Sequence, residues 1–133
     1  LPAHCVRSAA LVQLGRVREA IEVLDAIPGE RHDSLSTAWL SYALSRDGQV
    51  SRAKALVTGL QITQAAPACV SSYHLAVAHT GLGDHDSAFA SLDRARNERD
   101  PGLTFIAGEP RLAPLRSDRR YRQIVSALTR QSP

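Results

Sequence analysis

A glycine followed five residues later by an alanine occurs three times along this 133-residue chain, and this repeat constrains the fold more than any other feature. The glycines Gly15, Gly48 and Gly83 are 33 and 35 residues apart. Other positions repeat in the same phase, with an alanine five residues before each glycine and an aliphatic residue nine residues after it. These positions are Ala10, Ala43 and Ala78, then Ala20, Ala53 and Ala88, then Leu24, Val57 and Leu92. A period of about 34 residues is typical of a helical-hairpin repeat, so we expect stacked pairs of antiparallel helices.

The repeated residues have clear physical roles in such a hairpin. Glycine ends the first helix because a residue without a Cβ adopts a left-handed or tight turn at little cost. We expect the paired alanines where the two helices of a hairpin cross, since larger side chains would push the backbones apart. Aliphatic residues at helical spacing give each second helix one buried stripe. The pattern predicts helices over residues 2–14, 17–27, 34–46, 49–61, 69–81 and 84–97. They form one domain, with repeats at 1–33, 34–66 and 67–100 and a C-terminal cap at 101–133.

Two segments resemble the second-helix signature of the tetratricopeptide repeats. They are Leu14-Gly15-Arg16-Val17-Arg18-Glu19-Ala20-Ile21 and the run from Leu82-Gly83-Asp84 to Ala88. The resemblance covers about residues 1–97. It implies an all-α fold, in which three helical-hairpin repeats form a right-handed superhelix closed by a C-terminal capping helix.

The rest of the chain is similar to the end of many bacterial tetratricopeptide proteins, which are often the C-terminal parts of transcriptional regulators, cyclases and kinases. The similarity rests on Asp100-Pro101, on Pro110-Arg111-Leu112, and on Ser117-Asp118-Arg119-Arg120-Tyr121, where Arg119 replaces the family's usual proline. Asp118 is expected to cap the helix that follows. Ile124, Val125 and Leu128 would lay that helix on the open face of the third repeat.

Charge is divided unevenly along the chain. The formal net charge is +3, yet the segment 111–133 carries six arginines against one acid, Asp118. A basic end is either a footprint for nucleic acid or a solvated helix face, and we favour the solvated face. With 44% apolar and 22% charged residues and no apolar run long enough for a membrane helix, we expect a cytoplasmic protein that makes no membrane contact.

Catalytic and metal-binding patterns are not found in the sequence. Cys5 and Cys69 fall two repeats apart, too far for a disulfide. Cys69, His74 and His79 are spaced five apart, which turns them to different sides of one helix. We find neither a Gly-x-Ser-x-Gly elbow nor a phosphate-binding glycine loop. We therefore expect no enzyme activity, no metal and no cofactor.

The remaining candidate is a binding surface. In the family that the chain resembles, first helices line a concave groove that holds partners. When the groove positions of that family are matched one by one to this sequence, the resemblance implies a groove that is apolar apart from two tyrosines and one cation. Its candidate residues are Ala38, Tyr42, Arg46, Tyr73, Val77 and Thr80. Only Arg46 remains of the cations and amides with which some family members grip a terminal carboxylate.

The sequence therefore predicts a non-catalytic module that binds a protein or peptide, within a larger bacterial regulatory or signalling protein. A second copy of the chain is an alternative partner. Other interpretations stay open: the candidate groove residues are ordinary surface residues, or a neighbouring element of the chain fills the groove. A small-molecule sensor would need an enclosed pocket near Tyr42 and Tyr73. Contact with nucleic acid through the arginine-rich end would give binding a steep salt dependence.

Overall fold

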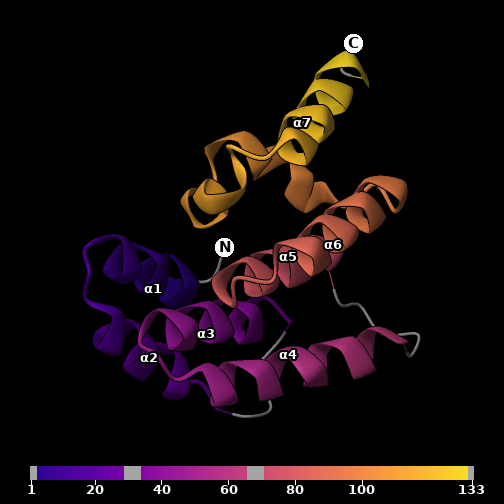
Figure 1. Ribbon diagram of the computed structural model, residues 1–133. Helices are drawn as coiled ribbons and strands as arrows, with labels where there is room; N and C mark the ends of the chain where they lie inside the picture. The colour runs from indigo at the N-terminus through magenta and orange to yellow at the C-terminus, as the bar shows by residue number, and fades with distance from the viewer. Residues whose placement is uncertain (1–2, 29–33, 66–70, 132–133) are drawn as a thin grey trace.

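The computed structural model describes residues 3–28, 34–65 and 71–131, and all regular secondary structure in these ranges is helical (Figure 1). The elements are α1 (Ala3–Gln13), α2 (Val17–Asp25), α3 (Ser34–Arg46), α4 (Val50–Ala65), α5 (Ser72–Gly81), α6 (His85–Asn97), the 3₁₀ helices η2 (Pro101–Gly108) and η3 (Pro110–Leu115), and α7 (Arg119–Gln131). All six helices expected from the repeat are present. The fourth extends four residues beyond its expected end, and the fifth begins at Ser72 rather than at Cys69, which lies outside the described residues.

The glycines of the repeat end the first helix of each hairpin, as predicted. Gly15, Gly48 and Gly83 adopt left-handed φ angles of 79°, 84° and 75°. Two backbone hydrogen bonds close each turn; at the second, Gly48 N donates to Ser45 O at 3.2 Å and Gln49 N to Leu44 O at 2.9 Å. At the other two turns as well, the glycine nitrogen donates to the carbonyl oxygen three residues earlier, and the nitrogen of the next residue donates to the carbonyl oxygen five residues earlier. This is the Schellman arrangement, which glycine makes at the lowest cost.

The alanine that follows each glycine is buried where the two helices of a hairpin cross. Ala20, Ala53 and Ala88 are all fully buried, which confirms the expectation for this slot. Ser41 on α3 donates its hydroxyl hydrogen to the backbone oxygen of Ala53 on α4 at 3.2 Å. This contact requires close approach of the two backbones, and the small side chain permits it.

The alanine that precedes each glycine has a different role from the one expected. Ala43 and Ala78 are fully buried, but Ala10 is exposed. Ser41 faces α4, and at about 100° per residue Ala43 lies on nearly the opposite side of α3, away from α4. This slot therefore packs between hairpins rather than within one. Ala10 is exposed because no described element covers that side of α1.

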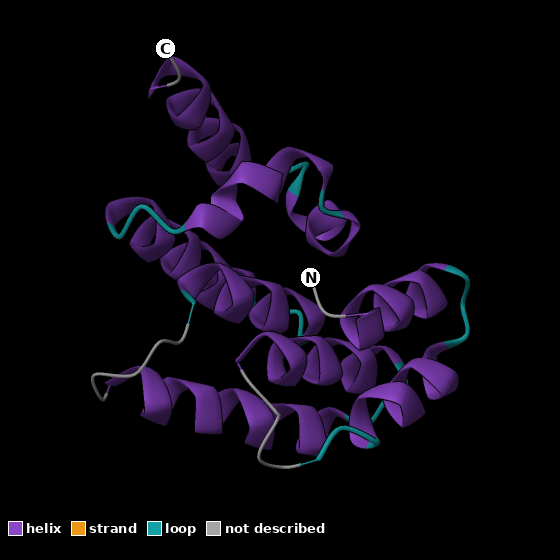
Figure 2. Ribbon diagram, turned by 180° about the vertical axis from the view of Figure 1, so that it is seen from behind, coloured by secondary structure: helices purple, strands orange, loops and turns teal. Residues whose placement is uncertain are grey.

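The segment from η2 to α7, which we call the tail, folds back over the helices. Figures 1 and 2 show η2 and η3 on the side of α3 and α5 that faces away from α4, and the far end of α7 projecting from the body. Asp118 Oδ1 accepts a hydrogen bond from Arg120 N at 2.8 Å, the cap expected at the start of α7. Ile124 is buried, while Val125 and Leu128 are half-buried against the core. As expected, α7 packs against α6 of the third hairpin. No helix in the described part of the chain combines the length and the apolar character needed to cross a membrane.

Candidate functional site

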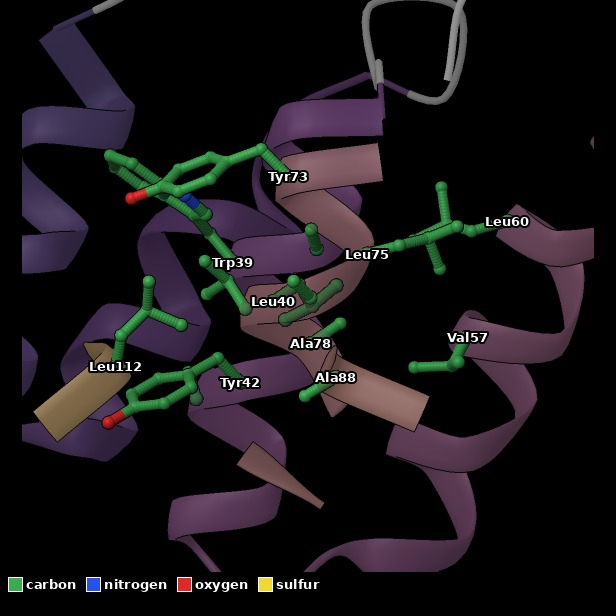
Figure 3. Close-up of a cluster of buried hydrophobic side chains, with 14 of the residues drawn as sticks. Trp39, Leu40, Tyr42, Val57, Leu60, Tyr73, Leu75, Ala78, Ala88 and Leu112 are labelled. Carbon is green, nitrogen blue, oxygen red and sulfur yellow. The ribbon is translucent and has the colours of Figure 1, made fainter. Parts of the chain in front are cut away.

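The six candidate groove residues, which define what we call the groove face, do not form an open surface. Five of them are at most 4% exposed, and only Arg46 is exposed to solvent. The five buried residues are Ala38, Tyr42, Tyr73, Val77 and Thr80. Figure 3 draws both tyrosines within the buried cluster, together with Leu112 from η3. The expectation of an accessible groove is therefore corrected: neighbouring elements fill it.

Two glycines account for how closely the tyrosines are covered. A Cβ placed on Gly102 of η2 would lie 2.6 Å from Cδ1 of Tyr73, so the tail backbone packs directly on that ring. A Cβ on Gly81 of α5 would lie 2.8 Å from Cδ2 of Tyr42, so that ring is covered by the next first helix. Both distances are shorter than any ordinary carbon contact. The spaces beside both rings are therefore filled by backbone.

Asp100 fixes the point at which the tail leaves α6 and meets α5. Its Oδ2 accepts hydrogen bonds from Ser71 Oγ at 2.6 Å and from Tyr73 N at 3.2 Å, and its Oδ1 accepts one from Gly102 N at 2.9 Å. Burial raises the pKa of this carboxyl, but the three hydrogen bonds outweigh burial and hold the pKa below its usual value. The ionised carboxylate thus joins the start of α5 to the start of η2.

Arg111 on η3 makes a second anchor over the groove face. Its guanidinium stacks on the Trp39 ring, with Cζ 3.9 Å from the ring centroid. Nε and Nη2 donate to the two carboxylate oxygens of Glu109 at 2.7 and 3.0 Å. Burial raises the pKa of Glu109, yet the hydrogen bonds and positive charge of Arg111 bring it below the usual value. The pair is almost wholly buried, so each charge depends on the other.

Arg111 belongs to the basic segment 111–133, for which a solvated face is expected, yet it is buried. Its position between two prolines gave no periodic signal of burial, and the contact that buries it comes from α3, far away in the chain. Tyr121, also part of the tail, donates its hydroxyl hydrogen to Ile106 O at 2.9 Å and so ties α7 to η2.

The other tail arginines are only partly available to a partner. Arg116 donates to the backbone oxygen of Glu109 at 3.1 Å. Arg120 pairs with Asp86 at 2.8 Å and Asp118 at 3.1 Å, and its guanidinium lies over the Phe89 ring. Arg119 and Arg122 are exposed. Within the described part of the tail, the arginines are thus divided between those engaged by neighbouring groups and those that are exposed.

His79 on α5 is a buried titratable group of the third hairpin. It is 4% exposed, and its Nε2 lies 3.4 Å from the side-chain nitrogen of Gln61 on α4. Burial lowers the pKa of His79, against a smaller opposing effect of Asp84. The neutral imidazole therefore fills part of the interface between the second and third hairpins. His74, Cys5 and His79 belong to no cluster of three metal-ligand types among the described residues.

Comparison of the chain with protein-family models, with curated proteins and with solved structures finds no match.

Proposed function

We propose that this chain is a non-catalytic protein-binding module of the tetratricopeptide type. In this proposal three hairpins form a right-handed superhelix, and the groove face takes an irregular, proline-containing peptide segment. The observation that carries the proposal is the tail itself, because residues 100–116 lie on the groove face as a peptide ligand would. Support for the helical architecture comes from the hairpins α1–α2, α3–α4 and α5–α6 and their identical turns.

The contacts of the tail indicate what such a ligand must offer. A glycine lets its backbone lie flat on Tyr73, and a carboxylate meets Ser71 Oγ and the backbone nitrogen of Tyr73. An arginine, with its own acidic partner, stacks on Trp39. Aromatic rings and arginine are the groups most often found at the energetic centre of protein interfaces. A competing segment from a partner would use the same contacts after the tail is displaced.

The other two functions have less support. A small-molecule sensor needs space beside Tyr42 and Tyr73, and both rings have backbone packed against them. Recognition of nucleic acid needs free cations, and Arg111, Arg116 and Arg120 are engaged within the chain.

The experiment is a titration of a labelled peptide covering residues 100–116 into the full chain. The parent chain should bind it weakly, because its own tail occupies the groove face at high effective concentration. The Asp100→Ala variant weakens that tail and should bind the peptide about tenfold more tightly or better, as its anchor makes three charge-assisted hydrogen bonds.

The matched control is Asp93→Ala, which removes the same charge from an exposed position on α6 that makes only a 4.0 Å contact with Arg96. If Asp100→Ala and Asp93→Ala bind the peptide equally, or neither binds it, the groove face is not a peptide site.

A further inference from the structure

A second surface lies away from the groove face, between the end of α6, η2 and the second half of α7. It is an open cleft of about 470 Å³, within the range of about 300–1,000 Å³ typical of binding sites. Leu103 and Ile106 of η2 are buried at its base. Val125 and Leu128 of α7 line it from the other side and are only half-buried. The cleft exists because α7 is amphipathic over its whole length, while its far half projects beyond the body (Figure 1).

The rim of this cleft is basic. Arg96 and Arg99 line it. Asp93 reaches Arg96 only at 4.0 Å, and Glu98, at the C-cap of α6, accepts hydrogen bonds from Arg94 and Ser72. Asp100 also lines the cleft, but both of its oxygens are engaged by Ser71, Tyr73 and Gly102. The side chain of Arg99 is exposed and makes no polar contact with the described residues. These two guanidinium groups and the apolar base would complement a ligand that carries carboxylates next to large aliphatic side chains.

The backbone at Arg99 adds an independent observation. Arg99 N donates to Arg96 O at 3.2 Å and Asp100 N to Ala95 O at 2.9 Å, the same closure as at the three glycine turns. Arg99 has a φ of 55°, so a large side chain occupies the position that glycine occupies in the other three turns. A left-handed conformation is costly for such a residue, and such cost is concentrated at functional sites. The turn holds the Arg99 guanidinium at the cleft in spite of that cost.

We propose that the cleft between α6, η2 and α7 binds an acidic, leucine-rich peptide segment of a partner protein, with its aliphatic side chains on Leu103, Ile106, Val125 and Leu128 and its carboxylates on Arg96 and Arg99. This surface is distinct from the groove face, and its use does not require the tail to move. Because the tail forms two of its sides, the segment binds only when the tail is docked. Occupancy of the cleft therefore opposes displacement of the tail, and the two sites are negatively coupled.

The test uses the full chain and three synthetic peptides with identical leucines. In the first, the positions flanking the leucines are glutamate, in the second glutamine and in the third lysine. NMR titration should show the glutamate peptide shifting the methyl signals of Leu103, Ile106, Val125 and Leu128, with an affinity that falls as salt is added. The glutamine peptide should bind more weakly, and the lysine peptide should not bind.

Two variants separate the cleft from general charge attraction. Arg99→Gly removes the guanidinium and puts a residue that tolerates a left-handed φ at this turn, so the variant keeps the fold. It should weaken binding of the glutamate peptide about three- to fivefold, the value of an exposed ion pair. Adding Arg96→Ala should bring the loss to about tenfold or more. The control, Arg122→Ala, removes the same charge from an exposed position on α7 that does not line the cleft, and should leave affinity unchanged.

The proposal is wrong if the four methyl groups do not shift, if the lysine peptide binds as well as the glutamate peptide, or if Arg122→Ala costs as much as Arg99→Gly. A labelled single-stranded oligonucleotide that competes for the same methyl groups would also overturn it, in favour of nucleic acid. Because the groove-face titration depends on Asp100→Ala and this one on Arg99→Gly, either proposal can fail while the other stands.

Discussion

The six helices of the hairpins and the tail are held together in different ways. Between the hairpin helices, small residues recur in equivalent slots, such as Ala53 and Ala88 within hairpins and Ala43 and Ala78 between them. The tail is held by contacts that occur once each, above all the carboxylate of Asp100 and the stacked, paired guanidinium of Arg111. Repeated apolar packing spreads stability over many residues, whereas the tail concentrates it in a few polar groups. The two regions should therefore respond differently to single substitutions.

The largest effect should come from Arg111→Ala. It leaves the buried carboxylate of Glu109 without its partner, and breaking a buried pair in this way costs about 3–5 kcal/mol. Hydrogen exchange should show loss of protection in residues 101–131 while α3 and α4 stay protected. The double variant Arg111→Met, Glu109→Gln should be milder, since neither charge is left alone. Uniform loss of protection across the chain would mean that tail and hairpins unfold as one unit.

The hairpins and the tail should lose stability at different pH values as the solution is acidified. The native pKa values of Asp100 and Glu109 are lowered, so their stabilising effect is complete above the unfolded pKa values of about 4 and is lost as pH falls through the native ones. The pKa of His79 is also lowered, so the hairpins begin to lose stability as pH falls below the unfolded histidine value of about 6.5.

We therefore expect thermal stability to decline first as the pH falls below about 6.5, and the tail to lose stability only below about pH 4. His79→Gln should remove the first phase and leave the second. Persistence of the first phase in that variant would assign it to another group.

Ala53→Leu tests the repeated packing. The larger side chain overpacks the crossing of α3 and α4 and should lower the free energy of unfolding by about 1–3 kcal/mol. Ala55→Leu is the matched control, because Ala55 lies on the same helix and is exposed. Chemical denaturation of the two variants should differ clearly. Equal stability would place the crossing at another residue.

The four equivalent turns allow the finest comparison. Gly48→Ala places a Cβ at a φ of 84° and should cost about 1 kcal/mol or slightly more, although nothing lies within 4 Å of that Cβ. Arg99→Gly makes the reverse change and should raise stability by about 0.5–1 kcal/mol, the relief of the left-handed residue minus the entropy cost of glycine. Thermal melts of the two variants measure these changes. If both variants shift the melting temperature in the same direction, φ does not control the stability of these turns.

Much of the hairpin region was predictable because its signals are local and periodic. The bounds of α3 and α6 were predicted to within one residue, and the glycine turns and the buried Ala20, Ala53 and Ala88 were predicted correctly. The prediction that Ala10, Ala43 and Ala78 lie where the two helices of a hairpin cross was wrong. The spacing of residues places a side chain on one side of its helix but does not say which neighbour covers that side. The partners of the protein stay a prediction.

The sequence by itself determined where the six hairpin helices lie to within a few residues, which glycines turn the chain, and that a cap follows the third hairpin. It could do so because hydrogen bonding along the backbone and the spacing of apolar residues act over a few residues. Only the tertiary structure decided that the groove face is covered and that Arg111 is buried while Arg99 lies at an open cleft. Those outcomes depend on contacts such as Asp100 with Tyr73 and Arg111 with Trp39, between residues far apart in the chain. Such contacts form only when the docked tail removes both partners from water together, and they have no period that a sequence could display.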